Sequence, residues 1–300
     1  MDLVPLDPKV PEAGDIVISV RKMLARYQIH PRKRLGQSFL EDTNIIRRIV
    51  DLTEPVENQT IIEIGAGLGQ MTEQLAEKAG KVIAIEIDPR LAEILRGRFS
   101  GSERVDVLEM DVLKFDFSSV CQERKIKIVG NIPYHISSPI LFRLLEYRRS
   151  ISTMILMFQK ELADRIMASP GTKDYGLPSV MVASCARIDC PIKVPPTCFY
   201  PVPAVFSSVL RFTFRNDLQI PDEALFAQIV RTAFAQRRKT LWNNLRRTGL
   251  PEGTVELILE ESQIDRTRRA ETLSVDEFSR LTRAWIENNT ADRPQSSPPK

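Results

Sequence analysis

Short apolar runs alternate with helically spaced apolar residues through the first two-thirds of the chain. Residues 60–65 read TIIEIG, an apolar run ending at glycine, which predicts a buried strand. Apolar side chains at Met71, Leu75 and Ala79 predict a helix after it. Further strands are expected at 81–87, 105–110, 126–129 and 153–158, with helices at 89–99, 138–147 and 160–168. This alternation is typical of an α/β domain whose parallel sheet is covered on both faces.

The pattern changes in the last third of the chain. After a helix at 179–186, strands at 188–194 and 207–214 flank a proline-rich loop, which predicts an antiparallel hairpin at a sheet edge. From Asp222 onward only helical spacing remains, with helices expected at 222–235, 237–248, 254–262 and 275–287. We therefore expect an N-terminal extension (1–20), an α/β domain (21–215), a small all-α domain (216–287) and a disordered tail (288–300).

Composition excludes several classes of protein. The hydrophobic fraction of 43% and charged fraction of 27% are ordinary for a soluble globular chain. No run of about 18 apolar residues occurs, so we expect no membrane-spanning helix. The four cysteines lack C-x-x-C spacing and both histidines lie far from them, so we expect no metal site and a reduced, cytoplasmic setting.

Basic residues gather in two segments although the net charge is only +3. Residues 21–34 contain six Lys or Arg and no acid, and residues 237–247 contain five Lys or Arg and no acid. Such segments suit contact with nucleic-acid phosphates. Solvated helix faces give the same pattern, and charge alone does not separate the two interpretations.

A glycine-rich loop follows the first predicted strand. Gly65, Gly67 and Gly69 let the backbone turn tightly and approach a ligand. Glu86 ends the next strand, where an acid accepts hydrogen bonds from ribose hydroxyls. The G-x-G-x-G spacing favours S-adenosyl-L-methionine over a dinucleotide, since that cofactor has no pyrophosphate to hold. Asp111 ends the third strand and is placed for the adenine amine or for a helix cap.

The fourth strand leads into Asn131, Ile132, Pro133 and Tyr134. An adenine amine is a poor nucleophile because its lone pair is delocalised into the ring. Acceptors aimed at its two protons, the Asn131 side-chain oxygen and the Ile132 carbonyl, increase its nucleophilicity. Pro133 stiffens the loop, and Tyr134 stacks on the splayed base. The motif lies at the carboxyl end of a strand, where this class of fold places its chemistry.

These motifs resemble the KsgA family of ribosomal RNA adenine dimethyltransferases. Five blocks carry the resemblance, namely RLGQSFL (34–40), EIGAGLG (63–69), NIPYHISSPI (131–140), VPPTCFYPVP (194–203) and AFAQRRKTLWNNL (233–245). The resemblance implies a Rossmann-like class I S-adenosylmethionine-dependent methyltransferase domain with a small C-terminal helical domain. It also implies transfer of two methyl groups to each of two adjacent adenosines in a hairpin near the 3′ end of 16S rRNA, late in 30S biogenesis.

The resemblance also assigns residues. It places cofactor contacts at Ser38, Leu40, Gly65, Glu86, Asp111 and Asn131. It pairs Phe199 with Tyr134 around the target base, the alternative being that Phe199 anchors its loop in the core. RNA contacts are expected at Arg32, Lys33, Arg34, Arg237, Arg238, Lys239, Arg246 and Arg247. The expected partner is small-subunit rRNA in a partly assembled 30S particle, bound by a monomer without metal or membrane.

Two departures from the family pattern stand near the predicted site. Ser38 occupies a position that is usually Asn or His. Ala204 and Phe206 replace the usual Lys and Asp after the P-x-P segment. Two other functions remain open: a methylase acting on large-subunit rRNA, and a non-catalytic RNA-binding assembly factor. The intact acids and the Asn131–Tyr134 motif favour catalysis.

Overall fold

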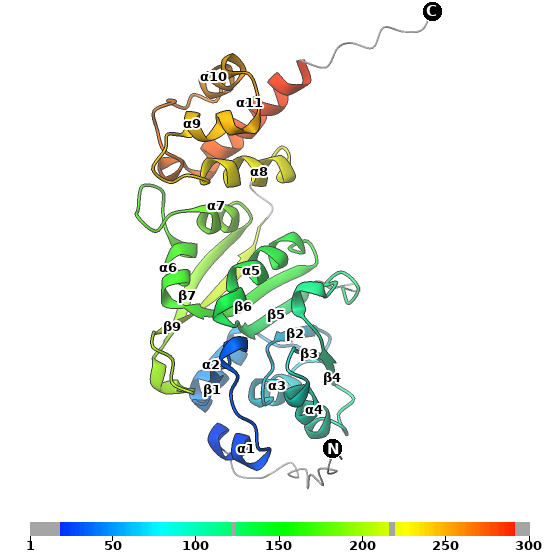
Figure 1. The fold of residues 1–300 in the computed structure, drawn as a ribbon. Coiled ribbons are helices and arrows are strands. Elements are labelled where there is room, and N and C mark those ends of the chain that lie inside the picture. The colour runs from blue at the N-terminus through cyan, green and yellow to red at the C-terminus, as the bar shows by residue number, and fades with distance from the viewer. Residues whose placement is uncertain (1–18, 122–123, 216–219, 292–300) are drawn as a thin grey trace, which may run out of the picture. The chain divides into compact units, whose positions relative to one another are not determined.

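The computed structural model describes residues 19–121, 124–215 and 220–291 (Figure 1). Contacts between residues divide the chain into two compact units. The first contains residues 1–163 and 188–214, and the second contains residues 164–187 and 215–300. Each unit has its own hydrophobic core and is described by itself.

The first unit contains a seven-stranded sheet, counted over the described residues, in the order β4-β3-β2-β5-β6-β9-β7. The neighbouring pairs from β4 to β6 are parallel, and β9 joins β6 in the antiparallel direction. The strand bounds are β2 (Thr60–Ile64), β3 (Lys81–Glu86), β4 (Val105–Glu109), β5 (Ile126–Asn131), β6 (Ile151–Gln159), β7 (Ala186–Val194) and β9 (Ser207–Phe214). The five parallel strands were expected from the apolar runs, and β7 and β9 lie side by side at the edge, as the hairpin prediction required.

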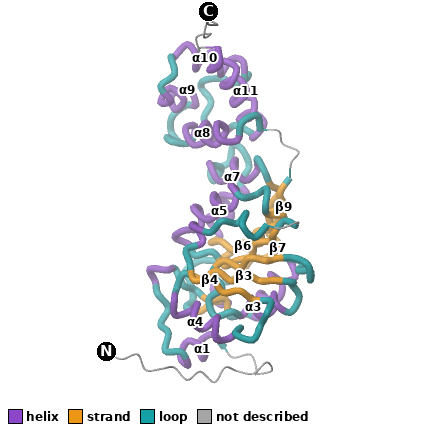
Figure 2. The backbone as a smooth tube through the Cα atoms, turned by 90° about the vertical axis from the view of Figure 1, so that its right-hand side faces the viewer, coloured by secondary structure: helices purple, strands orange, loops and turns teal. Residues whose placement is uncertain are grey.

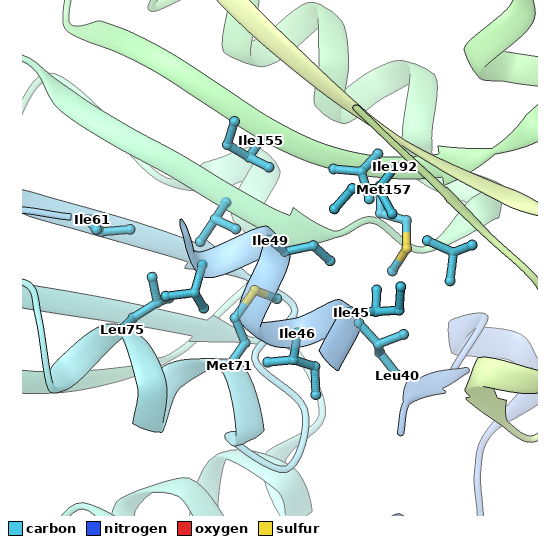
Figure 3. Close-up of a cluster of buried hydrophobic side chains, with 14 of the residues drawn as sticks. Leu40, Ile45, Ile46, Ile49, Ile61, Met71, Leu75, Ile155, Met157 and Ile192 are labelled. Atoms are coloured by element: carbon cyan, nitrogen blue, oxygen red, sulfur yellow. The ribbon is translucent and has the colours of Figure 1, made fainter. Parts of the chain in front are cut away.

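Both faces of the sheet are covered. Successive residues Ile61 and Ile62 of β2 point to opposite faces, yet both are fully buried. On one face, helix α2 (Thr43–Leu52) lays Ile45, Ile46 and Ile49 over the strands, as Figure 3 shows. Helix α2 was not expected from the sequence pattern, although Asp42 caps its first turn by accepting hydrogen bonds from the backbone N–H groups of Asn44 and Ile45.

The remaining elements of the first unit connect the strands (Figures 1 and 2). A two-stranded ladder joins segments far apart in sequence, β1 (Phe39–Leu40) and β8 (Phe199–Tyr200), which pair antiparallel. Neither strand was expected, because two residues are too few to show a period. The helices are α1 (Val20–Arg26), α3 (Gln70–Ala76), α4 (Pro89–Arg98) and α5 (Ser137–Glu146), with single 3₁₀ turns at Lys33–Leu35, Val112–Lys114, Tyr134–Ile136 and Pro196–Cys198. Helix α6 (Lys160–Met167) spans the division between the two units.

The second unit is helical. Its helices are α7 (Leu177–Ala183), α8 (Glu223–Ala233), α9 (Leu241–Leu245), α10 (Glu252–Glu261) and α11 (Val275–Ala291), with 3₁₀ turns at Arg246–Thr248 and Ala270–Thr272. Tyr175 and Val180 belong to the same apolar cluster as Phe226 and Phe278, which explains why residues 164–187 group with the C-terminal helices. From the sequence pattern, those residues were expected in the first domain.

Several boundaries differ from the sequence-based expectations, among them that between the helix expected at 179–186, which is α7 (Leu177–Ala183), and the following strand, which begins at Ala186. Helix α9 begins only at Leu241, because the Thr240 hydroxyl accepts a hydrogen bond from the backbone N–H of Asn243 and caps the helix there. Residues 237–239 therefore lie in a turn. Helix α11 continues to Ala291, four residues into the predicted tail. The predicted extension at 1–20 lies outside the described residues apart from Ser19 and Val20, which cap and begin α1.

Candidate functional site

A cavity opens at the carboxyl ends of four adjacent parallel strands. It is lined by Gly65 after β2, Glu86 at the end of β3, Asp111 after β4 and Asn131 at the end of β5. The chain crosses from one half of the sheet to the other between β2 and β5, and ligands bind at such crossover points in α/β folds. The cavity also includes Ser38 and Leu40, so it brings together all six residues assigned to cofactor contact.

The glycine loop forms one wall of this cavity. Gly65, Gly67 and Gly69 have φ angles of +73°, +59° and +83°, a region that residues with a side chain rarely adopt. A Cβ atom at Gly65 would lie 3.3 Å from the backbone oxygen of Asn131, and one at Gly67 would lie 3.3 Å from the Phe39 ring. The three glycines therefore permit the tight turn that the sequence indicated, and Gly65 and Gly67 let the loop lie close to Asn131 and Phe39.

Glu86 is buried and held by the backbone. One carboxylate oxygen accepts a hydrogen bond from the N–H of Gly67 at 2.9 Å. The other accepts from the N–H groups of Ile87 and Asp88 at 3.0 and 2.9 Å. Burial raises the pKa of Glu86, and the backbone donors offset part of that rise. These bonds use three of the about four lone pairs of the carboxylate, so one lone pair, on the oxygen that Gly67 contacts, remains for a ribose hydroxyl.

Asp111 performs the capping role that the sequence left as an alternative. One of its carboxylate oxygens, Oδ1, accepts a hydrogen bond from the N–H of Leu113 at 3.0 Å and begins a 3₁₀ turn. The residue also lines the cavity. Because this bond uses Oδ1, capping and a ligand contact through Oδ2 are compatible.

Glu63, in strand β2, is a buried acid. Its carboxylate accepts a hydrogen bond from the Thr72 hydroxyl at 2.5 Å, which braces strand β2 against helix α3. Burial raises the pKa of Glu63 to about 8; the Thr72 bond lowers it somewhat and the nearby charge of Glu86 raises it. Glu63 also lines the cavity. Glu63 therefore braces β2 against α3 at the wall of the cavity.

The side chain of Asn131 has a fixed orientation. Its Nδ2 donates a hydrogen bond to the backbone carbonyl of Ser38 at 2.9 Å. The carbonyl can only accept, so the amide must present Nδ2 there and keep Oδ1 for another donor. The Ser38 hydroxyl in turn donates to the backbone oxygen of Pro201 at 2.9 Å. Three distant segments thus meet at the end of β5.

The other residues of the predicted base-binding motif lie at the same place. Ile132, Pro133 and Tyr134 line the cavity. Ile132 is fully buried, and its N–H donates to the Met157 carbonyl at 3.2 Å, which ties the motif to β6. The Tyr134 hydroxyl shares a hydrogen bond with the Ser207 hydroxyl at 3.0 Å, and burial raises the pKa of the Tyr134 phenol while that bond lowers it.

Phe199 is not on the wall of the cavity. Its ring is 1% exposed and packs in the apolar cluster with Leu40, Ile192 and Val209. This placement agrees with the alternative, a loop anchor in the core, and contact of Phe199 with a bound base stays a prediction. The physical reason is the pairing of β8 with β1, which sets Phe199 opposite Leu40 and directs both side chains into the same core.

A second set of contacts holds the segment before β1 over the cavity, and the sequence analysis missed it. Gln37 Nε2 donates to Asp88 at 2.9 Å, and Gln37 Oε1 accepts from the N–H of Arg32 at 2.7 Å. Asp88 also pairs with Arg90 at 2.8 Å and with Arg32 at 3.4 Å. Burial alone would raise the pKa of Asp88, but the hydrogen bonds from Arg90 and Gln37 hold it at about 2. The only sequence signal was the acid before Pro89, which caps α4.

The predicted RNA-contacting residues have different environments. Arg32 is engaged by Asp88, so its first role is to hold the segment over the cavity. Arg237 donates to the backbone oxygens of Lys173 and Tyr175, and Arg246 pairs with Glu252 and stacks 4.4 Å from the Trp242 ring. The side chain of Lys33 lies outside the described residues. Arg237 also lies 4.0 Å from Glu271. Arg34, Arg238, Lys239 and Arg247 are exposed.

The residues of the cavity fit S-adenosyl-L-methionine. Three carboxylic acids line it, Glu63, Glu86 and Asp111, and none of the described lining residues is Lys or Arg. A dinucleotide needs donors or cations for its pyrophosphate, whereas a sulfonium cofactor carries positive charge and suits acidic surroundings. The fixed Glu86 carboxylate and the glycine loop complete a site for a nucleoside.

Comparison with known proteins agrees with this geometry. Residues 29–287 match the family model described as ribosomal RNA adenine dimethylase. The chain is 46% identical over 270 residues to Ribosomal RNA small subunit methyltransferase A of Syntrophus aciditrophicus, covering 87% of this chain and 96% of that protein. It is 44% identical over 276 residues to the protein of the same name from Geobacillus sp. (strain WCH70), covering 88% and 94%.

Solved structures show the same fold. A dimethyladenosine transferase from Plasmodium falciparum aligns with a TM-score of 0.73 and 25% identity, covering 84% of this chain and 98% of that one. The 23S rRNA methyltransferase ErmE aligns with a TM-score of 0.62 and 28% identity, covering 82% and 98%. With the acidic cavity, the glycine loop and the oriented Asn131, these matches show that the chain belongs to the ribosomal RNA adenine dimethylase family, whose members use S-adenosyl-L-methionine as methyl donor.

Proposed function

We propose that this enzyme transfers methyl groups to N6 of two adjacent adenosines in a hairpin near the 3′ end of 16S rRNA, late in assembly of the 30S subunit. One observation carries the proposal, the hydrogen bond from Asn131 Nδ2 to the Ser38 carbonyl at 2.9 Å. That bond leaves Oδ1 as the acceptor at the end of β5, which is what an adenine amine requires.

The residues around Asn131 suit an adenine. The proposed acceptors for the two N6 protons are Asn131 Oδ1 and the Ile132 carbonyl, and the ring of Tyr134 stacks on the base. Pro133 and the bond from Ile132 N–H to β6 keep the motif rigid, so little reorganisation is needed on binding. When bound, S-adenosyl-L-methionine supplies an activated methyl group. No strong base is needed, because the methylated amine is acidic and loses its proton to water.

The cofactor contacts follow from the cavity. We propose that Glu86 accepts a hydrogen bond from a ribose hydroxyl through its remaining lone pair and that Asp111 accepts from the adenine amine of the cofactor. The remainder of the cofactor is proposed to contact the backbone of Gly65, Ser38 and Leu40, since all three residues line the cavity. The Ser38 hydroxyl is already engaged by Pro201, so we assign its cofactor contact to the lone pairs it retains.

RNA contact is proposed at the exposed cations of both units. Arg34 directly precedes Leu35, a residue that lines the cavity. Arg238, Lys239 and Arg247 lie in the helical unit. Such residues contact phosphates and set affinity and position rather than sequence choice. We propose that the substrate is a partly assembled small subunit, bound by a single copy of this chain in the cytoplasm.

Large-subunit rRNA is the second candidate substrate, because ErmE, a 23S rRNA methyltransferase, shares the fold at 28% identity. The proteins named small subunit methyltransferase A are more similar, at 44–46% identity over most of the chain. We therefore favour the small subunit.

The deciding experiment measures transfer of labelled methyl groups to ribosomal subunits from cells that lack the modification. Small and large subunits are assayed in parallel. We expect about four methyl groups per small subunit, recovered as N6,N6-dimethyladenosine, which is two for each of two adenosines. Label on large-subunit RNA would instead identify large-subunit rRNA as the substrate. Binding of S-adenosyl-L-methionine without label on either subunit would favour a non-catalytic assembly factor.

A further inference from the structure

The loop at residues 201–206, between β8 and β9, is apolar and exposed. Val202, Val205 and Phe206 are large hydrophobic residues, yet their exposed fractions are 58%, 42% and 52%. The loop contains no charged residue. Single exposed apolar side chains are common, but three in one short loop, one of them a phenylalanine, indicate a contact surface.

Both ends of this apolar loop are attached to residues that line the cavity. At its start, the Pro201 carbonyl accepts a hydrogen bond from the Ser38 hydroxyl at 2.9 Å. At its end, Ser207 shares a hydrogen bond with the Tyr134 hydroxyl at 3.0 Å. The Phe206 carbonyl also accepts from the N–H of Lys160 at 2.9 Å, which fixes the backbone beside the exposed ring. The loop therefore borders the proposed binding place of the target base.

We propose that Phe206 is a stacking platform for the nucleotide next to the target adenosine. This inference rests on the proposed function, which places two adjacent adenosines at the site. While one base occupies the cavity beside Tyr134, its neighbour emerges at the border formed by the apolar loop. Unpaired bases stack on exposed aromatic rings, and Phe206 is the aromatic side chain of this loop.

A stacking contact by Phe206 differs chemically from the phosphate contacts that basic residues make. A phenylalanine ring binds the face of a base, releases no counterion and needs no particular base edge. The contact therefore adds affinity that does not depend on salt, whereas each phosphate contact steepens the salt dependence. The backbone at Phe206 is already fixed, and its side chain has only two rotatable bonds. Little conformational freedom is therefore lost when a base binds.

The test compares variants of Phe206 on unmodified small subunits. We expect Phe206→Ala to weaken binding, measured by co-sedimentation with S-adenosylhomocysteine present, by about tenfold, within the range found for base–aromatic stacking. The slope of log affinity against log salt should not change. KM for small subunits should rise with kcat near that of the parent. Phe206→Tyr should restore binding, and Phe206→Leu should not, because leucine is apolar without a π face.

Two controls make the outcome decisive. Leu257→Ala removes a side chain that is 44% exposed in helix α10 of the helical unit and should leave binding unchanged. Thermal unfolding and affinity for S-adenosylhomocysteine should match the parent in every Phe206 variant, since the ring is exposed. If Phe206→Ala binds like the parent, if leucine replaces phenylalanine fully, or if the salt slope changes, the inference is wrong while the proposed function stands. If the parent itself fails to methylate small subunits, the proposed function fails first.

Discussion

The side-chain nitrogen of Asn131 donates a hydrogen bond to the backbone carbonyl of Ser38, 93 residues earlier in the chain. The bond joins the end of β5 to the segment that covers the cavity. It also decides which end of the Asn131 amide is available to a substrate. An orientation that is essential to the proposed chemistry is therefore set by a backbone atom, not by the side chain of Ser38.

Substitution at position 131 tests that orientation. We expect Asn131→Ala to lower kcat by about 10²–10³-fold, the range for loss of one preorganised hydrogen-bonding group that acts in the transition state. Affinity for S-adenosylhomocysteine should change little. Ser38→Ala is the matched control, because it keeps the carbonyl that holds Asn131 and should retain far more turnover. Equal turnover in the parent and Asn131→Ala would contradict the assigned role.

The raised pKa of Glu63 predicts an unusual dependence of stability on pH. Its pKa rises from 4.5 to about 8 on folding, so the folded state binds more protons than the unfolded state between those values. The stabilisation is fully present below pH 4.5 and is lost as pH rises through 8. Each pKa unit corresponds to about 1.4 kcal/mol, so the total change is a few kcal/mol.

Glu63→Gln should remove this dependence while keeping an acceptor for the Thr72 hydroxyl. The free energy of unfolding, measured with denaturant at pH 6 and pH 9, should fall less between these pH values in the variant than in the parent. Glu93→Gln, on the exposed surface of α4, should behave like the parent. An identical fall in the parent and Glu63→Gln would show that Glu63 does not titrate in this range.

Gln37 should control access to the cavity through its bond to Asp88. Gln37→Ala removes a hydrogen bond to a charged group, worth about 1.5–3 kcal/mol, and frees the residues that cover the cavity. We expect affinity for S-adenosylhomocysteine, measured by calorimetry, to fall by about tenfold or more. Gln228→Ala, an exposed glutamine on α8, serves as the control. Unchanged affinity in Gln37→Ala would mean that the segment stays closed without this bond.

Arg238 and Arg246 should differ in their effect on RNA binding. Arg238 is exposed in the turn before α9, so Arg238→Ala should reduce the slope of log affinity for small subunits against log salt by about 1. Arg246 pairs with Glu252 and stacks on Trp242, so Arg246→Ala should change the salt slope less and lower the melting temperature more. Equal salt slopes for both variants and the parent would remove Arg238 from the RNA-binding surface.

The sequence by itself determined the parallel strands, the glycine loop and the position of Glu86, Asp111 and Asn131 at strand ends. These features are local: burial on both faces produces an unbroken apolar run, and a tight turn requires glycine. Because the carboxyl ends of parallel strands lie at one edge, strand-end residues meet wherever the sheet forms. The meeting of these strand-end residues at one edge of the sheet therefore followed from short-range pattern alone.

Only the tertiary structure decided which partners complete that cavity. The bond from Gln37 to Asp88 spans 51 residues, and that from Ser38 to Pro201 spans 163. The burial of Phe199, the engagement of Arg32 by Asp88 and the start of α9 at Leu241 were likewise decided by the tertiary structure. The spacing of apolar residues along the sequence indicates which side chains are buried. The partner of each side chain depends on which distant segment packs against it, and this packing is fixed only when the whole chain folds.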